Sequence, residues 1–365
     1  MIAKHGNDSH AVVKDQAGLV VVKHKPLNAE APLGALREAV TPLQHFYLRS
    51  NFDVPLLDPD SWRLHIGGAV ERPADLSLAE LRSHSTHTIT ATMECAGNSR
   101  TGLAPLPTGE PWGSGAVSTA IWRGVSLRSV LERTGLRPTA VEVVFTAADR
   151  GTMDGNSEVL PFARSLPIEK ALHPDTILVY EMNGVPLPPG HGGPVRLFVP
   201  GWYGMASVKW LVRIEAVEQP FTGFFQAQRY ILDLPGSITN EPLREMRVKS
   251  IITSPAPGAL LARGLQTISG VAWSGGGPIK TVEVSVEGGG AWQQAQLVGD
   301  GTPYGWQRWQ YEWVVTRPGR HVLRARATDE QGNVQPDVAA WNRLGYANNS
   351  IQPVIVQVQE QDTAG

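Results

Sequence analysis

The only cysteine of this 365-residue chain is the first candidate for chemistry. It lies in the run Thr92-Met93-Glu94-Cys95-Ala96-Gly97-Asn98-Ser99-Arg100. One thiol cannot form an intrachain disulfide, a four-cysteine zinc site or a protein-ligated iron–sulfur cluster, but it can act as a nucleophile or supply a thiolate to a metal. The alternative is a small buried apolar side chain. Gly97 lets the backbone approach a bulky ligand, and Arg100 places a cation near the sulfur that favours the thiolate. These neighbours favour a chemical role for Cys95.

The Cys95 run resembles the molybdenum-cysteine motif of the sulfite oxidase family of molybdopterin enzymes. The resemblance continues in the same order between residues 45 and 345. The further matching runs are Phe46-Tyr47-Leu48-Arg49-Ser50-Asn51, Pro111-Trp112 with Gly115-Ala116-Val117-Ser118-Thr119-Ala120, Tyr180-Glu181-Met182-Asn183-Gly184, His191-Gly192-Gly193-Pro194-Val195-Arg196, Val208-Lys209-Trp210-Leu211 and Trp341-Asn342. Because these runs are ordered and cover most of the chain, the resemblance is highly specific.

The resemblance implies a molybdopterin molybdenum cofactor with Cys95 as the protein ligand of the metal. In that family the dithiolene of the pterin supplies two sulfurs, so one protein cysteine is enough. Gripping the anionic pterin phosphate requires cations and backbone amides. The implied cofactor contacts are Leu48, Arg49, Ser50, Asn51, Phe52, Asp149, His191, Arg196, Ser207, Val208 and Lys209. The sequence has no Cys-x-x-Cys-His or cytochrome b5-like segment. We therefore expect no haem and an external electron acceptor such as a cytochrome c.

A pocket for sulfite or another small oxyanion is also implied by the resemblance. Arg49 and Arg100 match two arginines of the family's anion site, where guanidinium groups bind oxyanions in fork geometry. Trp112 matches a tryptophan that lines the pocket. Tyr230 matches the active-site tyrosine, which can pass a proton.

The chain departs from the family pattern around this pocket. Animal and plant enzymes have histidine where this chain has Asn51, and a second arginine of their cysteine motif is Ser99 here. Arg343 is offset by one position from the arginine that completes the anion site in eukaryotic members. The pocket is therefore predicted to be less positive than in eukaryotic sulfite oxidases.

The predicted reaction is the oxidation of sulfite to sulfate. A second hypothesis for an enzyme is the reduction of a sulfoxide or nitrate by the same metal centre. A reading from another class is a non-catalytic protein whose sandwich binds a partner while the cofactor domain is vestigial. The presence of Cys95 together with Arg196 and Lys209 argues against that last reading.

The composition excludes several classes of binding partner. A net charge of −2 gives no basic signature for nucleic acid and no polybasic patch for membranes. No apolar run is long enough to span a bilayer. The N-terminus has no apolar export segment and no twin arginine, so we expect a cytoplasmic enzyme, or a periplasmic one if a leader was removed.

The fold is predicted to be an α+β molybdopterin domain of the sulfite oxidase type over residues 1–240. Residues 1–40 are interpreted as an irregular arm. A β-branched strand over His87–Met93 delivers Cys95 at its end, and a helix is expected over Val125–Glu132.

An immunoglobulin-like β-sandwich is predicted for residues 241–365, where apolar residues alternate at period two between glycine-rich turns. In the resembled family this domain mediates dimerisation, so we expect a homodimer. Trp273, Trp292, Trp309 and Trp313 are expected to expose apolar surface for it.

Overall fold

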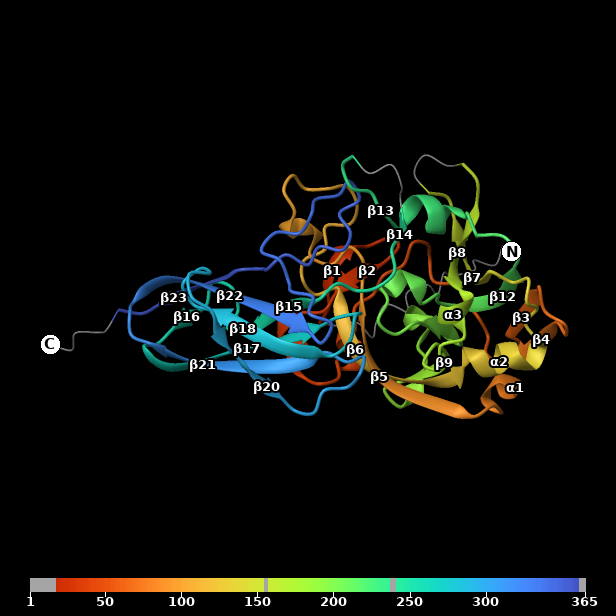
Figure 1. Cartoon of the computed structure of the whole chain (residues 1–365), viewed down its shortest axis with the longest axis horizontal. Coiled ribbons are helices and arrows are strands. Elements are labelled where there is room, and N and C mark those ends of the chain that lie inside the picture. Colours follow the sequence, from red (N-terminus) through yellow and green to blue (C-terminus); the bar gives the residue numbers. More distant parts are fainter. Residues whose placement is uncertain (1–17, 154–156, 237–240, 361–365) are drawn as a thin grey trace, which may run out of the picture.

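The computed structural model describes residues 18–153, 157–236 and 241–360. Figure 1 shows two lobes side by side along the long axis, with the C-terminal residues in the second lobe. The α-helices are short: α1 (Leu78–Arg82), α2 (Leu127–Thr134) and α3 (Ile168–Ala171). Most ordered structure is strand, and the helices lie in the first lobe, which confirms the α+β prediction.

Two five-stranded sheets form the framework of the first lobe. One is antiparallel, with order β10-β9-β6-β5 and β11 paired to β9; its strands are β5 (Thr86–Glu94), β6 (Val117–Ser126), β9 (Ile177–Met182), β10 (Val185–Pro186) and β11 (Arg196–Phe198). The other has order β4-β3-β12-β7-β8, with β12 parallel to β3; its strands are β3 (Arg63–Gly68), β4 (Ala74–Ser77), β7 (Glu142–Gly151), β8 (Leu160–Pro167) and β12 (Leu211–Val217).

Local sequence explains several element boundaries. Ser77 and Glu80 form a reciprocal capping box that begins α1. The helix expected from Val125 begins instead at Leu127, because Val125 still pairs with Leu178 of β9 as part of β6. That expected boundary was therefore wrong by two residues. Helix α2 then ends at Gly135, which adopts a positive φ of 72°.

The N-terminal segment is more ordered than the sequence indicated. Strand β1 (Val20–Lys23) pairs antiparallel with β2 (Asn28–Glu30). This hairpin lies near the junction of the two lobes (Figure 1). The prediction of an irregular arm is wrong for these residues, and its first part, residues 1–17, lies outside the described residues.

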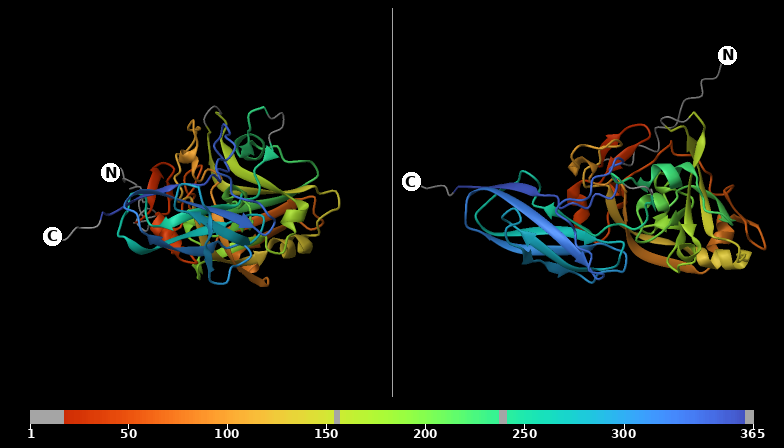
Figure 2. Two further views of the ribbon diagram at one scale, coloured as in Figure 1. Left: turned by 60° about the vertical axis from the view of Figure 1, so that its left-hand side comes forward. Right: turned by 45° about the horizontal axis from the view of Figure 1, so that its top comes forward.

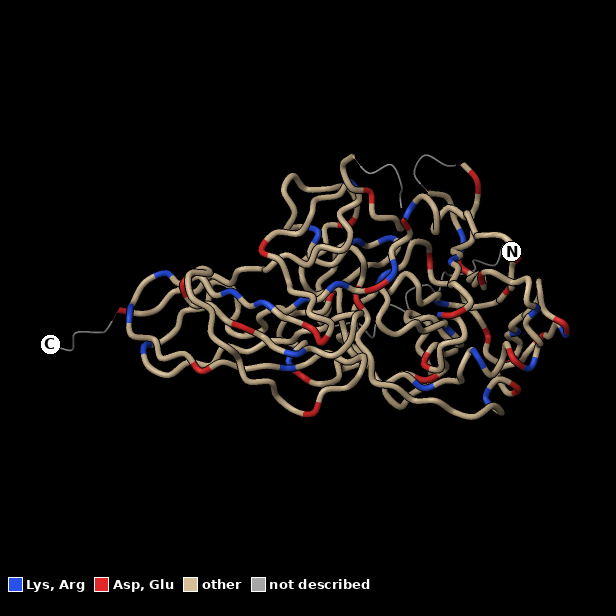
Figure 3. Tube along the Cα trace, viewed as in Figure 1, with Lys and Arg blue, Asp and Glu red and all other residues tan. Residues whose placement is uncertain are grey.

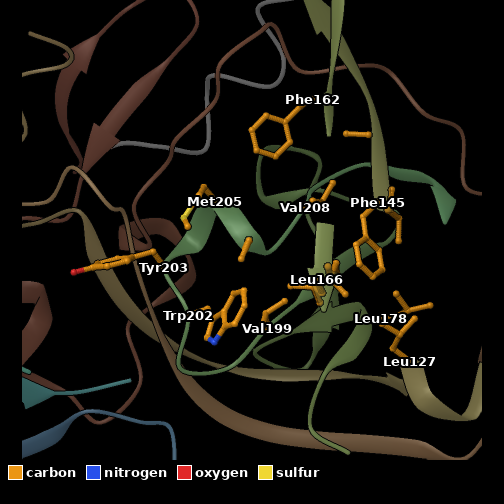
Figure 4. Close-up of a cluster of buried hydrophobic side chains, with 14 of the residues drawn as sticks. Leu127, Phe145, Phe162, Leu166, Leu178, Val199, Trp202, Tyr203, Met205 and Val208 are labelled. Atoms are coloured by element: carbon orange, nitrogen blue, oxygen red, sulfur yellow. The ribbon is translucent and has the colours of Figure 1, made fainter. Parts of the chain in front are cut away.

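Apolar side chains from both sheets and the connecting segments fill the first lobe. Figure 4 shows part of this core, where Leu127 of α2, Phe145 of β7 and Leu166 of β8 converge with Trp202 and Met205. The same cluster continues into Ile251, Val271 and Trp273 of the second lobe. The two lobes therefore share one apolar interface.

The second lobe is a two-sheet β-sandwich, as the period-two alternation predicted. One sheet has order β15-β17-β21-β20, formed by β15 (Lys249–Ser254), β17 (Gly264–Trp273), β20 (Gln296–Val298) and β21 (Gln307–Val315). The other has order β16-β23-β22-β18-β19, formed by β16 (Leu260–Leu261), β18 (Ile279–Ser285), β19 (Gln293–Gln294), β22 (Gly319–Asp329) and β23 (Val354–Val358). A short hairpin of β13 (Ile231–Leu232) and β14 (Glu241–Pro242) precedes it.

The tryptophans of the sandwich do not form an exposed apolar surface. Trp273, Trp309 and Trp313 are buried, and Trp292 is half-buried under the guanidinium of Arg326. That expectation was wrong because these rings fill the lobe's own interior and the junction.

The surface carries both charge signs along its length. Lysines and arginines are interspersed with aspartates and glutamates over both lobes (Figure 3). The right-hand view of Figure 2 shows the sandwich projecting from one end of the first lobe. Among the described residues, every helix is too short or too polar to cross a lipid bilayer.

Candidate active site

A partly open cavity lies in the first lobe, and Cys95 lies in its wall. Its walls come from the segment before β3, the end of β5, strands β7, β8 and β11, and the end of the π-helix at Phe225–Arg229. The sequence-predicted residues that line it are Arg49, Ser50, Asn51, Cys95, Asp149, His191, Arg196, Ser207, Lys209 and Tyr230. The fold thus brings together residues that are up to about half the chain apart in sequence.

Cys95 follows directly after β5, and its backbone N–H donates to the carbonyl of Ala116 at 2.9 Å. The thiol is buried. Burial raises the pKa of this thiol, and the nearby Arg49, the backbone of Gly97 and Arg100 oppose that shift only in part. The expectation that Arg100 favours the thiolate is therefore outweighed by burial in the protein alone. A bound metal, with its own positive charge, would reverse that balance.

At one end of the cavity, Arg49, Asn51 and Tyr230 form a hydrogen-bonded cluster. The Nη2 atom of Arg49 donates to Asn51 Oδ1 at 2.7 Å and lies 3.5 Å from the Tyr230 hydroxyl. Asn51 Nδ2 donates to the same hydroxyl at 3.2 Å. Tyr230 is held at the end of the π-helix, where its N–H donates to the carbonyl of Phe225. A cation, an amide and a phenol therefore converge at one point.

Glu110 is a charged neighbour of this cluster that the sequence analysis did not identify. One carboxylate oxygen lies 3.9 Å from Arg49 Nη2, and the other lies 3.2 Å from Lys23 Nζ. Burial raises the pKa of this carboxyl, but Arg49, a backbone hydrogen bond and Lys23 together outweigh burial and lower the pKa to about 2. Arg49 thus has a carboxylate beside it that offsets part of its charge.

Asn28 of the β1–β2 hairpin is another missed residue. Its Oδ1 atom accepts from the Ser50 N–H at 2.8 Å and from Arg49 Nη1 at 3.3 Å. The side chain therefore orients two residues of the cavity wall. A polar residue in a segment interpreted as irregular gives no local signal of such a contact.

At the other end of the cavity, the cations bind backbone carbonyls. Arg196 Nη1 donates to the His191 carbonyl at 2.9 Å and Nη2 to the Ser207 carbonyl at 2.8 Å. Lys209 Nζ donates to the Gly190 carbonyl at 3.2 Å and to Ser50 Oγ at 2.9 Å. Burial, followed by Lys209 and Arg196, lowers the pKa of His191 to about 3, so its imidazole is neutral.

Asp149 contributes a carboxylate to the same cavity. The residue is buried, and its Oδ1 atom has no hydrogen-bond partner in the protein. Burial raises its pKa to about 6, although Lys209 acts in the opposite direction. A buried unpaired acceptor is costly, so it marks a place where a ligand can donate a hydrogen bond.

The remaining predicted residues do not line the cavity. Leu48 pairs its backbone with Ala29, and Phe52 packs against Phe225. Val208 is fully buried and accepts from the Leu197 N–H through its carbonyl. Trp112 lies in the buried apolar cluster that also contains Cys95. These residues support the walls from behind, and their predicted contacts with the cofactor or substrate stay predictions.

The guanidinium of Arg100 lies behind the segment of residues 94–100, which we call the Cys95 loop. Its Nε and Nη2 atoms donate to the Leu344 carbonyl at 3.2 and 3.1 Å, and Nη1 donates to the Glu110 carbonyl at 2.6 Å. The guanidinium is also so close to Gly97 that an added Cβ would lie 2.7 Å from it. Arg343 is exposed and pairs with Asp233 at 2.6 Å. Binding of an oxyanion by Arg100 stays a prediction, since backbone carbonyls occupy its donors here.

Comparison with known proteins decides the family. Residues 51–225 match the oxidoreductase molybdopterin binding domain, and residues 240–359 match the Mo-co oxidoreductase dimerisation domain. Sulfite oxidase of Gallus gallus is 39% identical over 91% of this chain and 76% of its own length. The chain belongs to the sulfite oxidase family of molybdopterin oxidoreductases. Human mitochondrial sulfite oxidase is 36% identical over 93% of this chain, which spans 66% of that protein's length.

A solved structure supports the assignment to the sulfite oxidase family. The sulfane dehydrogenase SoxCD from Paracoccus pantotrophus superposes with a TM-score of 0.83 at 28% identity, covering 98% of this chain and 96% of the other. Both lobes therefore share their arrangement with a known enzyme. The domain boundary predicted at residues 240 and 241 stays a prediction; the first matched range ends at residue 225 and the second begins at residue 240.

The cavity fits the cofactor of the sulfite oxidase family by the chemistry of its walls. Arg49, Arg196 and Lys209 provide three cations against the carboxylate of Asp149, which suits an anionic phosphate. The unpaired Asp149 oxygen suits the amino and ring N–H donors of a pterin. The described part of the chain holds no cluster of three or more His, Cys, Asp or Glu side chains that could bind a metal. A single thiolate is thus what this site offers.

Proposed function

We propose that this protein oxidises sulfite to sulfate with a molybdopterin-bound molybdenum. The observation that carries the proposal is that one cavity joins the chain's only cysteine to the Arg49–Asn51–Tyr230 cluster. The reaction takes an oxygen atom from water and releases two protons and two electrons. The electrons pass to an external acceptor such as a cytochrome c.

In this proposal the cofactor occupies the cavity with Cys95 as the protein ligand of the metal. When bound, the molybdenum supplies the redox and oxygen-transfer chemistry. Arg196, Lys209 and the neutral His191 hold the phosphate and pterin end, where Ser50 and Ser207 also line the wall. The unpaired oxygen of Asp149 would accept a hydrogen bond from the pterin.

The oxyanion binds at the Arg49 end in this proposal. Arg49 binds substrate oxygens, and Asn51 keeps its guanidinium and the Tyr230 hydroxyl in fixed orientation. Tyr230 moves a proton at its hydroxyl. Arg100 acts from behind Gly97 by adding positive potential at Cys95, since its donors remain on carbonyls.

A homodimer through residues 241–365 is part of the proposal. The matched range in this lobe is described as a dimerisation domain. Leu265 of β17 and Val314 of β21 stand opposite each other and are 63% and 64% exposed, which is apolar surface that a second copy can cover. Light scattering at micromolar concentration is expected to give the mass of two chains, and a monomer would contradict this part.

The reaction is tested by steady-state turnover of purified protein with sulfite and ferricyanide. We expect sulfite-dependent reduction of ferricyanide by the wild type and none by Cys95→Ser, with Arg123→Gln in an exposed ion pair as the matched control. Full activity of Cys95→Ser would overturn the assignment. Faster reduction of nitrate or a sulfoxide by the dye-reduced protein than oxidation of sulfite would replace it with the reductase alternative.

A further inference from the structure

A buried hydrogen-bond network joins the Cys95 loop to the second lobe. Lys249, at the start of β15, is 1% exposed. Its Nζ atom donates to the Asn348 carbonyl at 2.8 Å, to Ser99 Oγ at 3.0 Å and to Glu94 Oε1 at 3.3 Å. An ammonium group has three donors, so every one of them has a partner.

Glu94 directly precedes Cys95 and is bound from both lobes. Its Oε1 atom accepts from Asn98 Nδ2 at 2.9 Å, and its Oε2 atom accepts from Trp273 Nε1 at 2.9 Å. Asn98 in turn accepts through Oδ1 from the N–H of Ala116, the residue whose carbonyl accepts from Cys95. The carboxylate therefore fixes both sides of the cysteine.

Asn348 closes the network on the far side of the loop. Its Nδ2 atom donates to the Ser99 carbonyl at 2.6 Å. The Cys95 loop thus receives donors from Lys249, Trp273 and Asn348, all of which belong to the second lobe. No residue of this network lines the cavity.

A buried ion pair is a weak source of stability, because desolvation of both charges offsets most of their attraction. Its directional hydrogen bonds instead restrict the groups that make them. Here those groups flank the thiol on both sides, at Glu94 and at Asn98 and Ser99.

We propose that Lys249 is a positioning residue for Cys95, acting through Glu94 and the Cys95 loop. The second lobe then has a role besides dimerisation, because it completes the geometry of the thiol that faces the cavity. This inference rests on the proposed function in that Cys95 is taken as the metal ligand.

The test uses the full-length protein prepared without cofactor. Cys95 is the only cysteine, so the rate of alkylation by iodoacetamide reports on this thiol alone. Lys249→Met keeps an unbranched side chain but leaves the buried Glu94 carboxylate without its cation, with only the neutral donors of Asn98 and Trp273. We expect the alkylation rate to rise about tenfold, and molybdenum retained after gel filtration of the loaded protein to fall about 10- to 100-fold, as for supporting partners of metal ligands.

Val282→Ala is the matched control for loss of stability. Val282 is fully buried in the core of the sandwich and does not belong to the network. Its truncation leaves a cavity that destabilises the same lobe. We expect alkylation and molybdenum retention near wild-type values in Val282→Ala, even where its melting temperature falls as far as that of Lys249→Met.

A second pair of variants keeps the test decisive if Lys249→Met does not fold. Glu94→Gln preserves shape and leaves Lys249 with neutral partners only, and we expect a smaller rise in alkylation, of about threefold. The double variant Glu94→Gln, Lys249→Met removes both charges, and we expect it to recover most of the loss seen with Lys249→Met.

Wild-type alkylation in Lys249→Met or Glu94→Gln overturns the inference, as does an equal rise in Val282→Ala. The outcome is separable from the proposed function, because alkylation of the cofactor-free protein requires neither sulfite nor molybdenum. Unchanged molybdenum content in Cys95→Ser would instead remove the metal-ligand assignment.

Discussion

The two ends of the cavity hold their cations in different ways. At one end, Arg49 donates to the side chains of Asn28 and Asn51 as well as to the Ser50 carbonyl, and Glu110 lies 3.9 Å away. At the other end, Arg196 and Lys209 donate mainly to backbone carbonyls. A carbonyl satisfies donors without cancelling charge, whereas a carboxylate cancels it. Lys209 has the carboxylate of Asp149 near it, and burial followed by Arg196 lowers the pKa of Lys209, whereas the pKa of Arg196 of about 10 keeps that guanidinium charged at neutral pH. We therefore expect Arg196 to suit the strongly anionic phosphate, and Arg49 beside Glu110 to suit a smaller anion.

The largest effect is expected from a variant that removes the proton-transferring hydroxyl at the Arg49 end and keeps the positive charge there. Tyr230→Phe removes one hydroxyl and leaves Arg49 in place, so we expect kcat with sulfite to fall about 100-fold while KM changes far less. Steady-state kinetics checks this. Tyr346→Phe is the control, because that ring lies 5.5 Å from Tyr230 but outside the cavity wall. A rise in KM with unchanged kcat would make Tyr230 a binding residue instead.

Removing charge at the Arg196 end should act on the cofactor and not on sulfite. Arg196→Gln deletes a charge-assisted contact of about 1.5–3 kcal/mol, so we expect the affinity for the cofactor to fall roughly 10- to 150-fold. The molybdenum and pterin content of the purified protein should fall with it. Elemental analysis and pterin fluorescence measure both. The conservative Arg196→Lys should retain part of the content. A fully loaded Arg196→Gln variant would show that the carbonyl-held cation does not bind the phosphate.

Acid should weaken the Arg196 end before the Arg49 end. Because the pKa of His191 is about 3 in the folded protein and 6.5 is its ordinary value, the unfolded state binds the proton first. Stability from this residue is present above pH 6.5 and is lost as pH falls, by about 1 kcal/mol between pH 6.5 and 5.5.

Urea unfolding of cofactor-free wild type and His191→Gln at the two pH values isolates this loss. Asp149 acts in the opposite direction, because its raised pKa of about 6 makes the folded state bind its proton first. Both proteins retain Asp149, so the difference between them belongs to His191. Equal pH dependence in the two proteins would contradict the prediction.

The smallest effect is expected from removing the carboxylate of Glu110, which offsets part of the positive charge of Arg49. Glu110→Gln removes a partly buried carboxylate from beside Arg49, so we expect the KM for sulfite to fall about two- to fivefold, equivalent to roughly 0.5–1 kcal/mol. Glu181→Gln, in an exposed ion pair with Arg123, serves as the control. A higher KM in Glu110→Gln would mean that Glu110 holds Arg49 in position and does not compete with the anion.

Much of the first lobe could be predicted because its signals are local. The β-branched run before Cys95 forms β5, and the capping box at Ser77 begins α1. Residues that belong to one motif, such as Arg49 and Asn51, reach the cavity together. The sandwich was predictable for the same reason, since period-two alternation encodes two-faced strands.

The contacts between distant segments could not be predicted from the sequence pattern. Asn28, Glu110 and Lys249 gave no local signal, because a polar residue in a loop or at a strand end has the same pattern whether it faces water or a buried partner. Arg100 was placed correctly near the cysteine, but the carbonyls that bind its donors come from Glu110 and from Leu344. Only the tertiary fold decides which acceptor a buried guanidinium meets.

The Cys95 loop is bound by Leu344 through Arg100 and by Asn348 through Ser99. During translation, these partners leave the ribosome long after the loop itself, since they lie 244 and 249 residues further along the chain. The loop therefore cannot reach its final geometry until Leu344 and Asn348 have been synthesised. Before that point, a newly made first lobe would present its thiol on an unfinished loop.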